Sequence, residues 1–193
     1  MPLLISDTGG SDFKILPQGQ YVAICNMVVD VGIQDGGQYK NKQKLYIRWE
    51  IPDERVEWNK DGEDMSGPAV IGNFYTASLS EKSLLRPILE AWRGRAFTAK
   101  ELAGFDIFSV LGKSCQLSVI HNEANNKTYA NVKAVMALPK GMKPLVAEND
   151  LIKYSPGDEG QWEDLPEWLQ KKINDGVKDE VELGEEPTDE VPF

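Results

Sequence analysis

Residues 42–51 (KQKLYIRWEI) alternate between apolar and polar side chains, and this two-residue period is typical of a β-strand with two different faces. The apolar set would form the core face: Leu45, Ile47, Trp49 and Ile51. The opposite face would carry cations around one aromatic ring: Lys42, Lys44, Tyr46, Arg48 and Glu50. A strand of this kind needs neighbouring strands that share its apolar face, so the segment predicts a sheet with one buried side.

Four further segments have strand-type patterns. Residues 21–33 precede this strand and end at the turn-forming sequence Asp35-Gly36-Gly37, while residues 69–77 follow it. Pro52 is expected to end the second strand, and residues 53–67 are expected to form a long loop. The last two strands, 114–121 and 128–138, would be joined by a tight turn at Asn125-Asn126.

Between the third and fourth strands the apolar period changes to that of a helix. A helix is expected at residues 81–92, with Ser80 as its N-cap, and a second one at residues 98–103, with Thr98 and Glu101 as a capping box. A further turn is expected at residues 105–111. The order of three strands, a helical insert and two strands predicts a mainly β chain with a five-stranded, OB-fold-like barrel over residues 15–145. Other small barrels can give the same order.

The charge is distributed unevenly along the 193 residues. Residues 148–193 carry 15 acidic and 4 basic side chains, so the net charge of -10 for the whole chain leaves a body close to neutral. We expect a short N-terminal extension, 1–14, and an acidic, mostly flexible tail, 146–193, with a possible short helix at 165–173. A near-neutral body can still hold a basic groove if its charges are segregated.

The polar face of the second strand suggests binding of single-stranded nucleic acid, because cations neutralise phosphates and an aromatic ring stacks on a base. The fifth strand adds an alternating Tyr/Lys pair, and the loops that flank an OB-fold groove add further lysines. The candidate residues are Lys40, Lys42, Lys44, Tyr46, Arg48, Tyr75, Lys127, Tyr129 and Lys133. A solvated strand face with tyrosines packed across the sheet is the alternative. The arginines of the helical insert extend the same track or simply form a solvated helix end: Arg86, Arg93 and Arg95.

The chain ends with the acidic sequence EEPTDEVPF. This ending resembles the acidic tip of bacterial single-stranded-DNA-binding proteins, which closes on acidic residues, an aliphatic residue, proline and phenylalanine. The layout of body and tail is similar to that of phage single-strand binders with an OB-fold. The resemblance implies that replication or repair proteins are bound through five residues: Asp189, Glu190, Val191, Pro192 and Phe193. The alternative is a solubilising tail. We also expect the tail carboxylates to compete with DNA for the basic groove.

No pattern specifies catalysis, a cofactor or a metal. Cys25 and Cys115 are far apart in the sequence and His121 is the only histidine, so neither a zinc motif nor a disulfide framework is predicted. No apolar run is long enough to cross a membrane, and residues 1–10 do not resemble a secretory signal. We therefore expect a non-enzymatic cytoplasmic protein, bacterial or phage-encoded, with its oligomeric state open.

The predicted function is sequence-independent binding and protection of single-stranded DNA in replication, recombination or repair. The same residues are compatible with two alternatives. The first is a strand-annealing or recombination-mediator protein. The second is an interaction adaptor that binds no nucleic acid.

Overall fold

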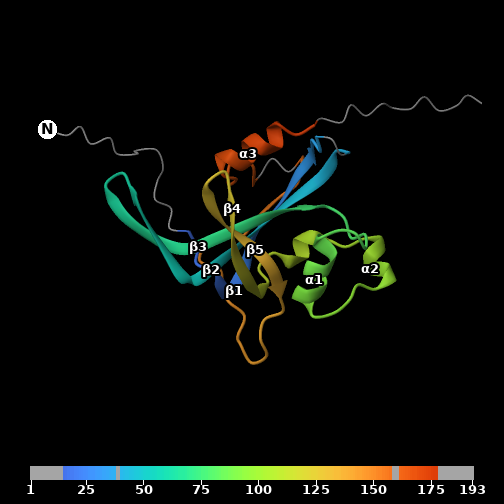
Figure 1. The fold of residues 1–193 in the computed structure, drawn as a ribbon, viewed down its shortest axis with the longest axis horizontal. Coiled ribbons are helices and arrows are strands. Elements are labelled where there is room, and N and C mark those ends of the chain that lie inside the picture. The colour runs from blue at the N-terminus through green and yellow to red at the C-terminus, as the bar shows by residue number, and fades with distance from the viewer. Residues whose placement is uncertain (1–14, 38–39, 158–160, 178–193) are drawn as a thin grey trace, which may run out of the picture.

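The computed structural model describes residues 15–37, 40–157 and 161–177, and five long antiparallel strands dominate it. These strands are β1 (Gly19–Gln34), β2 (Lys42–Lys60), β3 (Glu63–Thr76), β4 (Ser114–Ala124) and β5 (Lys127–Met136). They follow the order β3-β2-β1-β4-β5, and the sheet curls until β3 also comes close to β5 (Figure 1). The described chain is thus mainly β, with a curled half-barrel as predicted in outline.

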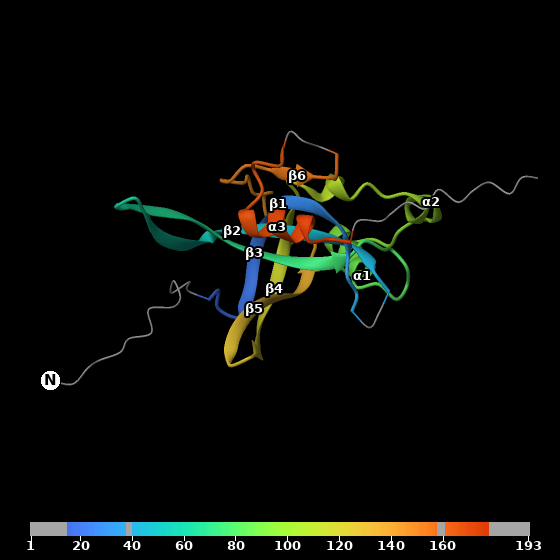
Figure 2. The same cartoon turned by 90° about the horizontal axis from the view of Figure 1, so that it is seen from above.

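The β2–β3 hairpin is longer than expected, because the predicted loop at 53–67 is a continuation of both strands. A register irregularity between Ile51 and Arg55 accommodates Pro52, and pairing then resumes as far as Lys60 and Glu63. The prediction was wrong because this arm is polar and exposed, and therefore lacks the apolar alternation by which a strand is recognised. The arm projects far from the rest of the molecule in Figures 1 and 2.

The tight turn expected at Asn125 and Asn126 is confirmed. Both residues have positive φ, 53° and 59°, which suits the right-handed twist of a two-residue hairpin. The β4–β5 hairpin therefore follows its local sequence closely, although β4 runs three residues farther than predicted.

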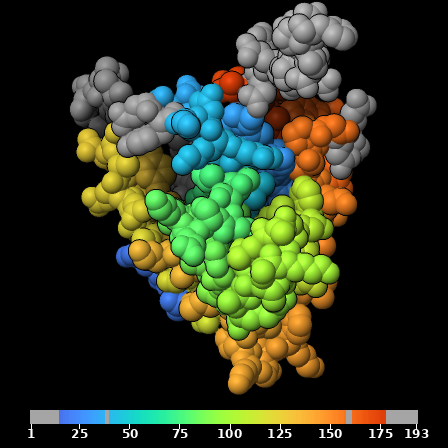
Figure 3. Space-filling model, turned by 90° about the vertical axis from the view of Figure 1, so that its right-hand side faces the viewer, coloured from blue at the N-terminus to red at the C-terminus, as the bar shows by residue number. Residues whose placement is uncertain are grey.

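A helical insert links β3 to β4 and contains α1 (Leu85–Arg93), α2 (Ala99–Ala103) and a 3-10 turn, η1 (Ile107–Val110). Helix α1 begins later than predicted, which places Pro87 in its first turn, where a missing N–H is tolerated. The capping box of Thr98 and Glu101 is present at α2. Residues of α1 and η1 pack against the concave core, and Figure 3 shows the insert as a compact mass on the face turned toward the viewer.

Two hydrophobic clusters lie on opposite sides of the sheet. The larger one fills the concave side, where the apolar face of β2 meets α1 through Leu89 and Trp92. The smaller cluster lies on the outer side and joins β1 to the C-terminal segment. Its buried members are Met27, Val29, Val31, Tyr46, Tyr154, Leu165 and Leu169.

The described residues of the C-terminal segment are folded as far as residue 177. Strand β6 (Ile152–Tyr154) pairs in parallel with β1, and α3 (Glu167–Asn174) lies against the outer side of the sheet (Figures 1 and 2). The helix expected at 165–173 is therefore present, but the boundary expected at residue 145 falls inside the folded body. Residues 178–193 and 1–14 lie outside the described residues.

Candidate nucleic-acid interface

The two faces of β2 are divided as the alternation predicts. Leu45, Ile47, Trp49 and Ile51 are buried in the concave core, whereas the cationic and aromatic set lies on the outer face. The outer face continues onto β3, where Phe74 stands opposite Tyr46 with their ring centroids 4.9 Å apart. The candidate interface is thus a surface shared by β2 and β3.

Tyr46 lies on the predicted face but is not open to solvent. Only 8% of the residue is exposed, because Phe74 lies beside its ring and Trp168 of α3 meets it edge-on at 5.2 Å. Burial raises the pKa of Tyr46, although Arg48 partly offsets this effect. Tyr46 therefore packs beneath Phe74 and Trp168, and α3 covers the position where a base was expected to stack on it.

Tyr75 is on the opposite side of the sheet. It is 3% exposed and packs edge-on against Trp49 in the concave core, with ring centroids 6.5 Å apart. Burial raises the pKa of Tyr75 to about 12, an effect that the nearby Asn73 partly offsets. This tyrosine is a core residue and is not accessible to a base in this structure.

Arg48 is partly buried and already has a protein partner. Its Nε donates to Asn26 Oδ1 at 3.1 Å, and burial lowers the pKa of its guanidinium. Asn26 sits at the irregularity of β1 between Cys25 and Met27, which turns its polar side chain toward β2. Arg48 also lines an open groove of about 560 Å³ with Glu54 and residues of β3, so its guanidinium can still be reached from one side.

The remaining candidate cations are exposed or nearly so. Lys44 Nζ donates to Thr76 Oγ1 at 2.9 Å and is only partly buried, while Lys40 and Lys42 are exposed next to the β1–β2 hairpin. At the other hairpin, Lys127 is exposed at the start of β5, followed by Lys133. Tyr129 on the same strand is 46% exposed. The two hairpin tips and α3 lie at the same end of the molecule (top in Figure 1).

The arginines of the helical insert are neutralised by local carboxylates. Arg86 pairs with Glu90 at 3.1 Å, whereas Arg93 and Arg95 both pair with Glu101. The hydrogen bonds from Arg95 and from the Thr98 backbone keep the pKa of Glu101 well below its usual range. These cations stabilise the insert. Their pairing favours the interpretation that they belong to a helix end and do not form a track for phosphates.

The structural role of one buried carboxylate, Glu50, was not predicted from the sequence. Glu50, fully buried on the outer face of β2, accepts hydrogen bonds from the backbone N–H groups of Glu148 and Asn149 at 2.7 and 3.0 Å. The Asn149 side chain adds a third bond at 2.7 Å. Glu50 thereby fixes the connection between β5 and β6. Its place in an alternating strand gave no signal of this role, since the partners come from far along the chain.

Among the described residues, the cysteines and acidic side chains offer no metal site. Cys25 and Cys115 are both buried free thiols on neighbouring strands. Within the residues that the structure describes, no cluster of three or more His, Cys, Asp or Glu side chains could hold a metal ion. In the same part of the chain, no helix has both the length and the apolar character needed to cross a membrane.

Comparisons with known proteins were made at the levels of family, sequence and fold. No family model, curated protein or solved structure matches this chain.

Proposed function

We propose that this protein binds single-stranded DNA without sequence preference, through an OB-type body. The order β3-β2-β1-β4-β5, the curl that brings β3 toward β5 and the helical insert before β4 all support an OB-type arrangement. OB-folds bind oligonucleotides on the outer side of strands 2 and 3, between the β1–β2 and β4–β5 loops.

The observation that carries the proposal is the combination of cations and aromatic rings on that surface. Phe74 lies 36% exposed beside Tyr46, and Lys42 and Lys44 lie on the same face of β2. Lys40 and Lys127 extend the positive charge onto the two flanking loops. Such a surface can neutralise phosphates and stack bases at the same time, which is what sequence-independent single-strand binding needs.

The C-terminal tip supports a second part of the proposal, recruitment of replication or repair proteins. Residues 189–193 lie outside the described residues, so this part rests on the resemblance of Asp-Glu-Val-Pro-Phe to the acidic tip of bacterial single-strand binders. An acidic peptide with one aromatic anchor would bind a basic-rimmed apolar pocket weakly and reversibly.

The test is binding of a fluorescent single-stranded oligonucleotide to the full chain across a salt series, with the matching duplex as control. We expect tight binding of the single strand, much weaker binding of the duplex, and a steep loss of affinity with salt. The double substitution Lys42→Gln and Lys127→Gln should weaken binding of all sequences alike. No binding at low salt, either by the full chain or after removal of residues 178–193, would overturn the proposal.

A further inference from the structure

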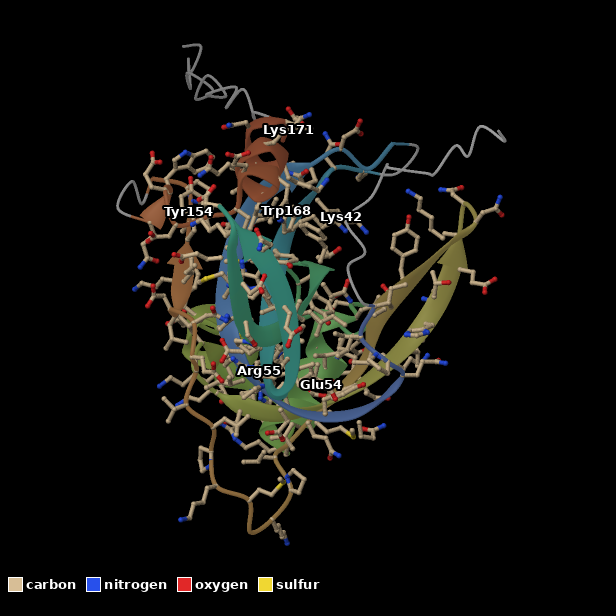
Figure 4. All side chains as sticks on the ribbon, turned by 90° about the vertical axis from the view of Figure 1, so that its left-hand side faces the viewer. Lys42, Glu54, Arg55, Tyr154, Trp168 and Lys171 are labelled. Atoms are coloured by element: carbon tan, nitrogen blue, oxygen red, sulfur yellow. The ribbon has the colours of Figure 1, made fainter. Side chains whose placement is uncertain are left out.

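Helix α3 has one buried side and one side that faces solvent above the candidate interface. Leu165 and Leu169 are 3% and 0% exposed and anchor the segment on the outer side of β1 and β2. Trp168, in contrast to these leucines, is 50% exposed. Lys171 and Lys172 lie one turn farther along the same side of the helix as Trp168. Figure 4 shows Trp168 below Lys171 and near Lys42.

The exposed side of α3 is continuous with the aromatic surface of the sheet. The Trp168 ring meets Tyr46 at 5.2 Å and Phe74 at 6.3 Å, both edge-on, and Lys172 Nζ lies 5.7 Å from the Phe74 ring centroid. Aromatic rings and ammonium groups from β3 and α3 therefore form one patch. We call this patch the α3 platform: Phe74, Trp168, Lys171 and Lys172.

The platform is fixed in place by bonds at the end of α3. Gln34 Nε2 donates to the Lys172 carbonyl oxygen at 3.3 Å, and the Val177 N–H donates to the Ile33 carbonyl oxygen at 2.9 Å. Gly176 fits closely against the end of β1, where a Cβ would lie 2.9 Å from Gln34 Nε2. A surface held in this way is ordered before a ligand arrives, so binding costs little conformational entropy.

We propose that the α3 platform is a stacking site for single-stranded DNA, in which a base stacks on Trp168 instead of on the covered ring of Tyr46. This inference rests on the proposed function and extends it to residues that the alternation of β2 could not identify. Trp168 and Phe74 stack on neighbouring bases, while Lys171 and Lys172 neutralise phosphates beside them.

The charge of the platform favours nucleic acid over an apolar protein partner. Within the described residues, neither Lys171 nor Lys172 forms an ion pair, and the helix holds two lysines against the single acid Glu167. Glu167 occupies the first turn, where the helix macrodipole favours a negative charge. Lys42 lies nearby, since its strand partner Gln34 bonds to Lys172. Unpaired lysines around exposed rings complement a phosphate backbone.

The deciding experiment compares Trp168→Ala with Trp58→Ala in the full chain. Trp58 is exposed to a similar extent, 45%, but lies on the polar arm of β2. We expect Trp168→Ala to weaken binding of a fluorescent single-stranded oligonucleotide about 5- to 150-fold, the range found for loss of one stacked base. Trp58→Ala should change the affinity less than about twofold. Trp168→Phe keeps an aromatic ring over Tyr46 and should recover most of the lost affinity.

A second pair of variants tests the cations of the platform. Lys171→Gln with Lys172→Gln should lower the slope of log affinity against log salt by about 0.7 for each lysine that contacts a phosphate. The control, Lys60→Gln at the far tip of the β2–β3 arm, should leave the slope unchanged.

The outcomes separate the two proposals. If the unmodified chain binds no single-stranded DNA, the proposed function fails. If it binds but the platform variants bind equally well, only the present inference is overturned. Tighter binding by Trp168→Ala would also overturn it, because α3 would then be a lid over Tyr46 rather than part of the interface.

Discussion

The backbone of Gly72 lies directly against the ring of Tyr46. A Cβ at Gly72 would be 2.1 Å from Tyr46 Oη and 2.4 Å from Cζ, far inside van der Waals contact. The absence of a side chain on β3 at this position lets Tyr46 lie flat across the sheet. Trp168 of α3 packs edge-on against the same ring. The position of α3 on the sheet therefore depends on a glycine of β3, which is two strands away from β1.

Gly72→Ala should therefore displace Tyr46 and loosen α3. We expect the free energy of unfolding to fall by about 1–3 kcal/mol, as for other overpacked sites, with a lower midpoint in urea. Gly104→Ala is the matched control, because no described atom lies within 4 Å of a Cβ built there. Equal stability of both variants would show that Tyr46 can move without cost.

Glu50→Gln tests the buried carboxylate that holds residues 148 and 149. The amide keeps one acceptor oxygen and loses the charge, so the three short hydrogen bonds from Glu148 and Asn149 cannot all be kept. We expect a loss of about 1–3 kcal/mol in the free energy of unfolding.

Hydrogen exchange locates the effect of this change. The backbone amides of Glu148 and Asn149 should exchange faster in Glu50→Gln than in the unmodified chain. Glu57→Gln, on the exposed polar arm, is the control and should change neither stability nor exchange at these amides. Unchanged protection in Glu50→Gln would contradict the anchoring role.

Tyr75 should make the fold sensitive to alkaline pH. Burial raises its pKa to about 12 in the folded chain, against about 10 for an exposed tyrosine, so its contribution to stability is complete below pH 10 and is lost as the pH rises from about 10 to 12. Two pKa units correspond to about 2–3 kcal/mol. Tyr46 acts in the same direction, because burial raises its pKa too.

Tyr75→Phe is expected to reduce this alkaline loss rather than abolish it. The Tyr75 hydroxyl is buried and has no hydrogen-bond partner of good geometry among the described residues, so its removal should cost little at neutral pH. Urea unfolding at several pH values between 8 and 12 provides the measurement. Tyr129→Phe, which alters a half-exposed tyrosine, is the control. A Tyr75→Phe variant with the same alkaline loss as the unmodified chain would contradict the assignment.

The two cysteines should be unreactive in the native protein. Both are 0% exposed, and burial raises the pKa of Cys25 to about 12 and that of Cys115 farther still. A thiol-reactive reagent at pH 8 should therefore modify neither residue in the folded chain and both in guanidinium chloride. Rapid native reaction of either thiol would show that the sheet opens near the β1–β4 pairing.

Removal of residues 178–193 tests the acidic tail. These residues lie outside the described part of the chain, and the expectation comes from their charge. If the carboxylates compete with DNA for the lysines of the interface, the truncated chain should bind a single strand more tightly at low salt, and the difference should shrink as salt screens the charges. Equal affinity at all salt concentrations would exclude the competition.

The sequence by itself determined those features that depend on neighbouring residues. The alternation of β2, the capping box of α2 and the Asn125-Asn126 turn all follow from backbone preferences and side-chain periods that act over a few positions. The order of strands and insert followed from the same local signals, and it predicted the mainly β half-barrel in outline but not β6, the sixth strand of the sheet.

Only the tertiary structure decided which faces are covered. Alternation separates two faces of a strand, but it does not say what packs on them, because the covering segment can come from anywhere in the chain. Tyr46 is buried because α3 returns to the outer side of the sheet, and Glu50 is satisfied by backbone groups beyond β5. The polar arm of β2 and β3 was missed for the related reason that its pairing needs no apolar face. Because of this long-range packing, the exposed ring at this point of the surface is Trp168 of α3 and not Tyr46 of β2.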